Sequence, residues 1–208
     1  GLTWATAYPT LQAAADLAGY GTEIWVAQGT YSAATGDAVV RLHPGTALYG
    51  GFAGTESTRD ARSSDPGKTV IEGGGVRRCV TAKISVVLDT FTLCGGNATH
   101  GGGIQYGAAV NCIFTGNTAD SGGGVFGGSA MNCQFIENKG NYGGGITNGI
   151  AINCTFTRNS ATYGGGMYGS TIANCTFTGN EASYQGGGMY GGTAKNSIIV
   201  YNKVYDIT

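Results

Sequence analysis

Hydrophobic and polar positions of this 208-residue chain alternate with a period of two in short segments of its second half. Along residues 110–115 the valine, cysteine and phenylalanine fall on one face, and the asparagine, isoleucine and threonine fall on the other. The same alternation returns along residues 152–157. A period of two predicts half-buried β-strands whose cysteine and phenylalanine side chains point inward.

These segments belong to a repeat. Glycine triplets begin at Gly101, Gly122, Gly143, Gly164 and Gly186, in steps of 21, 21, 21 and 22 residues. The same step separates a cysteine column at Cys112, Cys133, Cys154 and Cys175, a phenylalanine column at Phe114, Phe135, Phe156 and Phe177, and an asparagine column at Asn117, Asn138, Asn159, Asn180 and Asn202. A further asparagine precedes each cysteine, and an apolar residue follows each triplet. A fixed period near 20 residues indicates a solenoid.

The class of solenoid follows from the repeat unit. Leucine-rich repeats have a similar length but need leucine columns, and leucine is nearly absent after Leu93. Helical repeats need roughly 30 residues or more and good helix formers, not three successive glycines. Two or three short strands in about 21 residues predict an all-β fold, a right-handed parallel β-helix.

Successive coils of such a helix stack about 4.8 Å apart, so each column becomes a ladder of like side chains. We expect the cysteine and phenylalanine ladders to form a dry core. Asn117 and its equivalents are expected at a turn, where asparagine adopts the left-handed conformation and bonds the backbone of the next coil.

The chain is predicted to form one domain, residues 1–208. Residues 1–22 are an N-terminal cap, in which Pro9–Ala18 is expected to be a short amphipathic helix that covers the open edge of the first coil. Residues 23–90 form irregular coils, with strands expected at 23–27, 39–42, 47–49, 69–71 and 86–93 and an exposed charged loop at 56–68. Regular coils are assigned to residues 91–208, because Phe91 and Leu93 lie 21 residues before the first cysteine and phenylalanine of the columns.

The repeat resembles a known family. Its glycine triplet and following apolar residue, paired with the segments F-T-G-N, F-I-E-N and F-T-R-N, resemble the repeats of chlamydial polymorphic outer membrane proteins. Four other segments resemble secreted bacterial right-handed β-helix proteins of the pectate-lyase-like superfamily: Trp4–Gln12, Glu23–Tyr31, Leu48–Phe52 and Phe91–Asn97. The resemblance implies a β-helix and a secreted or cell-surface location. It implies no single activity, because this superfamily includes lyases, tailspikes, adhesins and scaffolds.

Composition excludes several classes. Glycine supplies 40 residues without a G-X-Y period, which excludes collagen, and 41% hydrophobic residues are too many for a disordered linker. A net charge of −1 predicts no nucleic-acid partner. No run of about 18 apolar residues is present, so we expect no membrane-spanning helix.

Candidate catalytic groups do not converge. The lyases and hydrolases that the fold resembles need several carboxylates at one point, for Ca²⁺ or for glycoside cleavage. The acidic residues of the repeat fall in different columns: Asp120, Glu137, Glu181 and Asp206. Elsewhere the best local group is Glu72 with Arg77 and Arg78, which we interpret as a solvated strand end, and the two histidines, His43 and His100, precede turns. We expect no catalytic residue, no metal site and no cofactor.

Six cysteines are an even number, which is typical of disulfides in a secreted protein. Stacked cysteines, however, would hold their Cβ atoms near the ~4.8 Å coil spacing, above the ~3.8 Å that a disulfide prefers. The ladder is therefore predicted to consist of buried free thiols. Cys79 and Cys94 lie outside the ladder, and the pattern leaves open whether they pair.

Aromatic residues form two further columns. Tyr142, Tyr163 and Tyr184 precede the triplets and predict an exposed stripe, and Phe126, Tyr168 and Tyr190 predict a second, broken one. Such rings stack on sugars or bury in a protein contact, so a polysaccharide is one expected partner. Alternatively, they cover the glycine backbone of adjacent coils.

The two chain ends carry further expectations. The chain begins without a signal peptide although its repeat resembles secreted proteins, so Gly1 is expected to be a processed or trimmed terminus. No polar capping repeat follows the last coil, which predicts an open edge for strand addition. That edge consists of Ile198, Ile199, Val200, Tyr201, Val204, Tyr205 and Ile207. Its expected partner is a following domain or the head of a second copy, and a head-to-tail contact builds a filament.

Together, these features predict a non-enzymatic extracellular structural or adhesion solenoid that assembles end to end. The alternative is a carbohydrate-active or carbohydrate-binding β-helix similar to polysaccharide lyases, which loops before Gly75 would favour if they brought acidic residues together.

Overall fold

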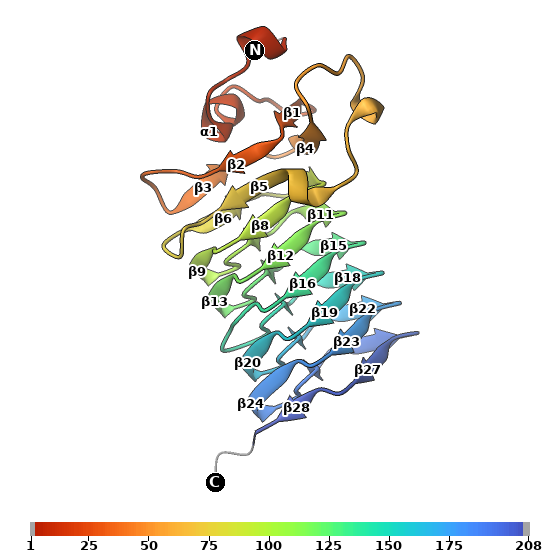
Figure 1. Ribbon diagram of the computed structural model, residues 1–208. Helices are drawn as coiled ribbons and strands as arrows, with labels where there is room; N and C mark the ends of the chain where they lie inside the picture. The colour runs from red at the N-terminus through yellow and green to blue at the C-terminus, as the bar shows by residue number, and fades with distance from the viewer. Residues whose placement is uncertain (1–2, 206–208) are drawn as a thin grey trace.

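The computed structural model describes residues 3–205, which form a rod of stacked coils with about 21 residues per coil (Figure 1). The paired strands in this part of the chain run parallel and join each coil to the next. The predicted class, an all-β parallel solenoid with a short N-terminal helix, is confirmed.

Three long sheets run the length of the rod. Sheet A consists of β1 (Glu23–Ala27), β4 (Ala47–Phe52), β7 (Val87–Asp89), β11 (Ala108–Val110), β15 (Ser129–Met131), β18 (Ile150–Ile152), β22 (Thr171–Ala173) and β26 (Thr193–Lys195). Sheet B consists of β2 (Gly29–Tyr31), β5 (Thr69–Glu72), β8 (Thr92–Cys94), β12 (Ile113–Thr115), β16 (Gln134–Ile136), β19 (Thr155–Thr157), β23 (Thr176–Thr178) and β27 (Ile198–Val200). Sheet C consists of β3 (Ala38–Arg41), β6 (Arg78–Thr81), β10 (Ile104–Gln105), β14 (Val125–Phe126), β17 (Ile146–Thr147), β21 (Met167–Tyr168) and β25 (Met189–Tyr190).

A fourth face, between sheets B and C, is less regular. It contains the pair β9 (Asn97–His100) and β13 (Thr118–Ser121), and the group β20 (Ser160–Tyr163), β24 (Glu181–Gln185) and β28 (Lys203–Val204). Between them Lys139 and Tyr142 form only single bridges to the strands on either side. We call these elements sheet D.

The N-terminal end of the rod is covered. Helix α1 (Leu11–Ala15) is shorter than the predicted 9–18 segment, and the Thr10 hydroxyl caps it by accepting from the Ala13 N–H at 3.2 Å. Leu11 and Ala15 are buried against the core. The Gln12 side chain accepts from the Arg41 N–H at 2.8 Å, so it satisfies a backbone donor of edge strand β3.

Three short 3-10 turns complete the helical part: η1 (Trp4–Thr6), η2 (Arg59–Ala61) and η3 (Pro66–Lys68). The last two lie in the charged loop 56–68, which leaves the rod between β4 and β5 (Figure 1). Arg62 anchors this loop through an ion pair with Asp89 at 2.8 Å and a bond to the Gly50 carbonyl at 3.0 Å. The loop is mostly exposed, as predicted, and Arg62 ties its base to the coils.

The corner between sheets A and B differs from the prediction. The expected strands 110–115 and 152–157 are each split, because β11 ends at Val110 and β12 begins only at Ile113. The expected strand 86–93 is split likewise at Thr90, whose φ is 66°. Asparagine tolerates the left-handed backbone that such a corner needs. At this corner the backbone is left-handed at the asparagine before each ladder cysteine and at the equivalent position before Ser197, namely at Asn111, Asn132, Asn153, Asn174 and Asn196.

The left-handed conformation predicted for the Asn117 column is therefore wrong, whereas its predicted bonding to the backbone of a neighbouring coil is confirmed, since Asn117 Oδ1 accepts from the Gly96 N–H at 2.8 Å. Asn159, fully buried, accepts at Oδ1 from both the backbone N–H and the side-chain amide of Asn138 at 3.0 Å. Its own side-chain amide donates to the Phe135 carbonyl at 2.9 Å and to Asn180 Oδ1 at 2.9 Å. Each buried asparagine thus satisfies backbone groups of adjoining coils, which water cannot reach.

The phenylalanine column forms the centre of the core. Phe114, Phe135, Phe156 and Phe177 are fully buried and stack with ring centroids 4.9, 4.5 and 4.2 Å apart and ring planes within 8° of parallel. Leu93 pairs in register with Phe114, and Ile71 with Leu93, so the column continues back into the first hundred residues.

The glycine triplets are explained by close packing. At Gly122 φ is 66°, a conformation that disfavours side chains. A Cβ at Gly123 would lie 2.5 Å from the Gly144 carbonyl oxygen, and one at Gly124 would lie 2.8 Å from the Phe135 ring. The triplet is required because the backbone passes directly against the next coil and the stacked phenylalanines.

Replacing Asn159 by alanine is expected to destabilise the rod by at least about 3 kcal/mol, since it leaves two buried donors on Asn138 and the Phe135 carbonyl unpaired, at about 1–3 kcal/mol each. The matched control is Asn174→Gly. Asn174 is exposed, its backbone is left-handed, and glycine keeps that conformation, so a loss of about 1 kcal/mol or less is expected. Urea unfolding of both variants measures the difference, and equal losses would contradict the role given to the buried column.

Candidate functional site

The predicted tyrosine stripe lies where sheet D meets sheet C. Tyr142 and Tyr163 are bridge partners on successive coils, and their rings stack with centroids 5.5 Å apart and planes 8° apart. Tyr184, on β24, places its ring centroid 5.1 Å from that of Tyr163. The three rings therefore form a row along the axis of the rod.

The second predicted stripe joins the first. Tyr168 on β21 lies edge-on to Tyr142 at 5.1 Å, and Tyr190 on β25 lies edge-on to Tyr163 at 5.6 Å. Tyr168 and Tyr190 stack on each other at 5.5 Å. We call the five residues, Tyr142, Tyr163, Tyr168, Tyr184 and Tyr190, the tyrosine patch. Tyr142 and Tyr184 are exposed, and the other three are half-buried.

Phe126 does not belong to the patch. Thr147 occupies the intervening position of its column, and the Thr147 hydroxyl donates to the Tyr142 carbonyl at 2.6 Å. Phe126 instead contacts the His100 ring at 4.6 Å and the Tyr106 ring at 6.1 Å. His100 thus packs on an aromatic ring, and His43 lies exposed before the turn at Pro44.

The phenols of the patch influence one another. The pKa of Tyr163 is raised above its ordinary value, first by desolvation and then by the nearby phenols of Tyr184, Tyr142, Tyr190 and Tyr168. Each of these groups becomes negative on ionisation, so each disfavours a charge on Tyr163. At neutral pH the Tyr163 hydroxyl therefore keeps its proton.

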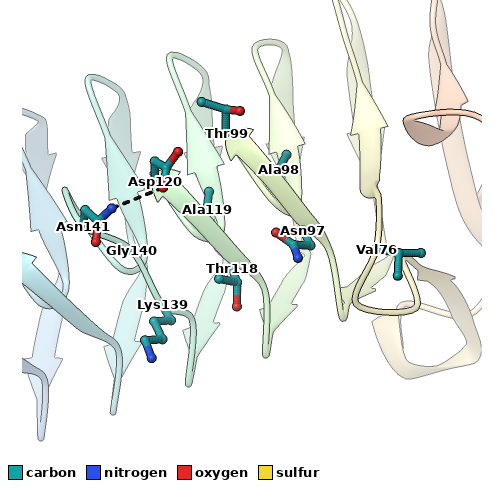
Figure 2. Close-up of a pocket in the computed structure, with 10 residues that line it drawn as sticks. All are labelled: Val76, Asn97, Ala98, Thr99, Thr118, Ala119, Asp120, Lys139, Gly140 and Asn141. Carbon is teal, nitrogen blue, oxygen red and sulfur yellow. Dashed lines mark hydrogen bonds between the residues drawn. The ribbon is translucent and has the colours of Figure 1, made fainter.

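A polar groove of about 470 Å³ lies on sheet D, and Figure 2 shows the residues that line it. Val76 lies at one end of it and Asn141, directly before Tyr142, at the other. The Asn141 side chain donates to Asp120 Oδ1 at 3.2 Å. The remaining lining residues are Asn97, Ala98, Thr99, Thr118, Ala119, Lys139 and Gly140. Hydroxyl, amide, carboxylate and ammonium groups thus continue from the aromatic row along the rod.

The group Glu72, Arg77 and Arg78 was predicted to be a solvated strand end, and this prediction is wrong for Arg78, whereas Glu72 is exposed at the end of β5. Arg78 is buried, and its guanidinium donates to the carbonyls of His100 and Gly101 at 2.7 and 2.9 Å. Burial lowers its pKa. Arg78 therefore ties its coil to the next one, and its donors are occupied. Within residues 3–205, no group of three or more His, Cys, Asp or Glu side chains is placed to hold a metal ion.

All six cysteines are free thiols, including Cys79 and Cys94. The four cysteines of the ladder are buried, and each thiol donates to backbone carbonyls, as Cys154 Sγ does to Ile152 at 3.2 Å. The hydrogen bond with Cys133 and burial raise the pKa of Cys154 to about 12. Cys94 is only half-buried, and burial followed by the charge of Glu72 raises its pKa.

The last described coil exposes apolar side chains. Ile199 continues the phenylalanine column and is 40% exposed, whereas Phe177, its partner in the preceding coil, is 0% exposed. Other exposed apolar residues of this coil are Ile198, Val200, Tyr201, Val204 and Tyr205. Ile207, also predicted for this edge, lies outside the described residues.

No protein-family model, curated protein or solved structure matches the chain. The parallel β-solenoid that the resemblance implied is present, and the comparisons attach no family to it. No helix within residues 3–205 has both the length and the apolar character needed to cross a bilayer.

The two aromatic columns are visible in the sequence, but the contact between their rings is not. The columns lie five residues apart in the chain, as at Tyr163 and Tyr168, with a glycine triplet between them. At the triplet the chain turns tightly from sheet D to sheet C, which brings the two columns side by side. A close approach of this kind has no signature in a 21-residue period.

Thiol labelling tests the accessibility of the cysteines. Because the four ladder thiols and Cys79 are buried, a maleimide is expected to label native protein only at half-buried Cys94 and unfolded protein at all six cysteines. Mass spectrometry counts the labels. The control Cys94→Ser should remove native labelling, and fewer than six labels after unfolding without reductant would reveal a disulfide.

Proposed function

We propose that this chain serves as a non-enzymatic extracellular structural or adhesion element, and that its last coil is an assembly end. The proposal rests on apolar side chains of the last described coil that are exposed although their equivalents in preceding coils are buried. The clearest example is Ile199, which is exposed, whereas its partner Phe177 is fully buried. The extracellular location rests on the resemblance of the repeat to secreted proteins.

The chemistry of that edge indicates which kind of surface can pack on it. Within residues 3–205, strands β26, β27 and β28 pair with a neighbour on one side only and carry exposed apolar side chains, so the matching surface is another layer of parallel β-structure. A following coil of a longer chain supplies such a layer, and so does the first coil of a second copy. In the second case the contact is head to tail and builds a filament.

The N-terminal end constrains this assembly. Helix α1 covers the first coil with Leu11 and Ala15, and Gln12 occupies the Arg41 backbone donor. The Trp4 ring packs against Phe52 at 5.4 Å and its N–H donates to the Glu56 carbonyl at 2.9 Å. Head-to-tail stacking of two copies therefore requires this cap to move aside.

Sedimentation velocity and electron microscopy of the 208-residue chain test the assembly end. Rising protein concentration is expected to produce larger species, and Leu11→Ser, which weakens the cap, should increase them. Ile199→Lys should suppress them, because a charge at the edge opposes strand addition. The matched control is Ile150→Lys, an exposed isoleucine (50%) in a central coil, which should assemble normally. If the unaltered chain and the Leu11→Ser variant both stay monomeric at every concentration, the proposal that the chain forms filaments is wrong.

A second candidate function is carbohydrate binding. The observation that favours it is the tyrosine patch, an axial row of rings beside a groove of hydroxyl, amide and charged groups. Aromatic faces stack on sugar rings and the polar groups supply hydrogen bonds. The form proposed is binding and not cleavage, because Asp120, Glu137 and Glu181 occupy different columns of the repeat.

Retention on insoluble polysaccharides such as cellulose and chitin tests this candidate. Tyr142→Ala with Tyr163→Ala is expected to weaken retention about tenfold, since two aromatic contacts contribute about 0.5–1.5 kcal/mol each. Tyr20→Ala removes an exposed tyrosine remote from the patch and should have no effect. Equal retention of the double variant and the unaltered chain would contradict binding through the patch.

A further inference from the structure

Tyr163 lies at the centre of five phenol rings that contact one another. Its ring centroid lies 5.5 Å from that of Tyr142, 5.1 Å from that of Tyr184 and 5.6 Å from that of Tyr190. Tyr168 completes the group at 5.1 Å from Tyr142 and 5.5 Å from Tyr190. Packing of sugars or proteins needs exposed rings, but it does not need phenols in mutual contact.

The backbone determines which phenols are neighbours. Tyr142 and Tyr163 are bridge partners, and β20, which ends at Tyr163, pairs with β24, which carries Tyr184. The three residues therefore occupy successive coils and cannot separate while the rod is folded. Their side chains are partly exposed, so each ring can rotate about χ1 and χ2 and bring an ortho carbon against its neighbour.

Exposure also decides whether a reagent reaches the rings. Tyr142 and Tyr184 are exposed at the two ends of the row, and Tyr163 between them is half-buried. A small oxidant can therefore take an electron from an outer ring, and the ring contacts offer the resulting radical a partner without a second protein molecule. The Tyr163 hydroxyl is protonated at neutral pH, since its pKa is raised, so its oxidation removes a proton as well as an electron.

We propose that the tyrosine patch is an oxidative cross-linking site, at which a one-electron oxidant couples Tyr163 to Tyr142 or to Tyr184 as dityrosine. The oxidant is a haem peroxidase acting with hydrogen peroxide, or an equivalent one-electron system. The cross-link joins two neighbouring coils of one chain.

The coupling joins two phenols through one new carbon–carbon bond. Each of two phenols loses one electron and its hydroxyl proton and becomes a phenoxyl radical. The two radicals form one carbon–carbon bond between ortho carbons. The hydrogen on each bonded carbon then shifts to the oxygen, which restores both phenols. Two electrons and two protons leave in total, and together with one hydrogen peroxide they form two water molecules.

Such a bond would act on the rod as a disulfide acts on a loop. Joining neighbouring coils closes one repeat and removes entropy from the unfolded chain, so it opposes unfolding. This consequence suits a structural element, but the cross-link depends neither on assembly at the last coil nor on a bound glycan.

The test is oxidation of the purified 208-residue chain by a haem peroxidase and hydrogen peroxide, at a dilution where sedimentation shows monomers. Dityrosine fluorescence is expected to rise while the protein still migrates as a monomer on a denaturing gel. The intact mass should fall by two hydrogen atoms per cross-link. Peptide mapping should place the link between Tyr163 and Tyr142 or Tyr184, and the urea midpoint of the cross-linked chain should increase.

Two phenylalanine variants provide the controls. Tyr163→Phe keeps the ring packing but removes the reactive hydroxyl, so the intramolecular yield should fall several-fold while circular dichroism stays unchanged. Tyr20→Phe, which changes an exposed tyrosine beside Gly45 at the other end of the rod, should leave the yield unaltered. An unchanged yield in Tyr163→Phe, cross-links that join only separate molecules, or no dityrosine at all would each overturn the proposal. Because the experiment is run on monomers without glycan, a failure of the proposed function would not affect its result.

Discussion

The stacking of one coil on the next, in register and at one spacing, is the constraint on which the rest of this structure depends. A coil of about 21 residues cannot bury its inner side chains alone, so the interior exists only between coils. Phe156 is buried because Phe135 and Phe177 lie on either side of it at 4.5 and 4.2 Å. The buried asparagines supply the polar contacts between coils, because each side-chain amide bonds backbone groups of adjoining coils.

The register between coils also determines how side chains are arranged on the surface. Any outward residue that recurs in the repeat must lie directly over its equivalent, so an exposed row is a consequence of the stacked core. The exposed asparagines form one such row, in which Asn153 donates to Asn132 at 3.2 Å and Asn111 donates to Asp89 at 3.0 Å. The tyrosine row is another, and there the repeated group is aromatic and chemically reactive. Function is therefore expected in rows along the axis and not in a single deep cleft.

The described rod has two unlike ends. At the N-terminal end, side chains cover the first coil: Gln12 bonds the edge strand, and Leu11 packs in the core. On β7, the third strand of sheet A, Asp89 pairs with Arg62 and accepts from Asn111, which ends the row of asparagines. At the last described coil, Ile199 has a partner on only one side. Within the described residues, side chains cover the first coil, whereas the inner apolar face of the last coil is exposed.

The repeat was enough to predict the solenoid, its period and the side chains of its core, because identical residues at a constant step can stack only along one axis. Equally local patterns predicted the cap helix and the two aromatic columns. The folded structure was needed to place the residues around the axis. It showed that Asn111 and not Asn117 makes the left-handed corner, that Arg78 turns inward to bond two carbonyls, and that Tyr163 meets Tyr168's column across a glycine turn. A repeat period fixes the order of residues along the rod. The angular position of each residue around the axis depends on where its coil bends, and contacts with the coils on either side set those bends.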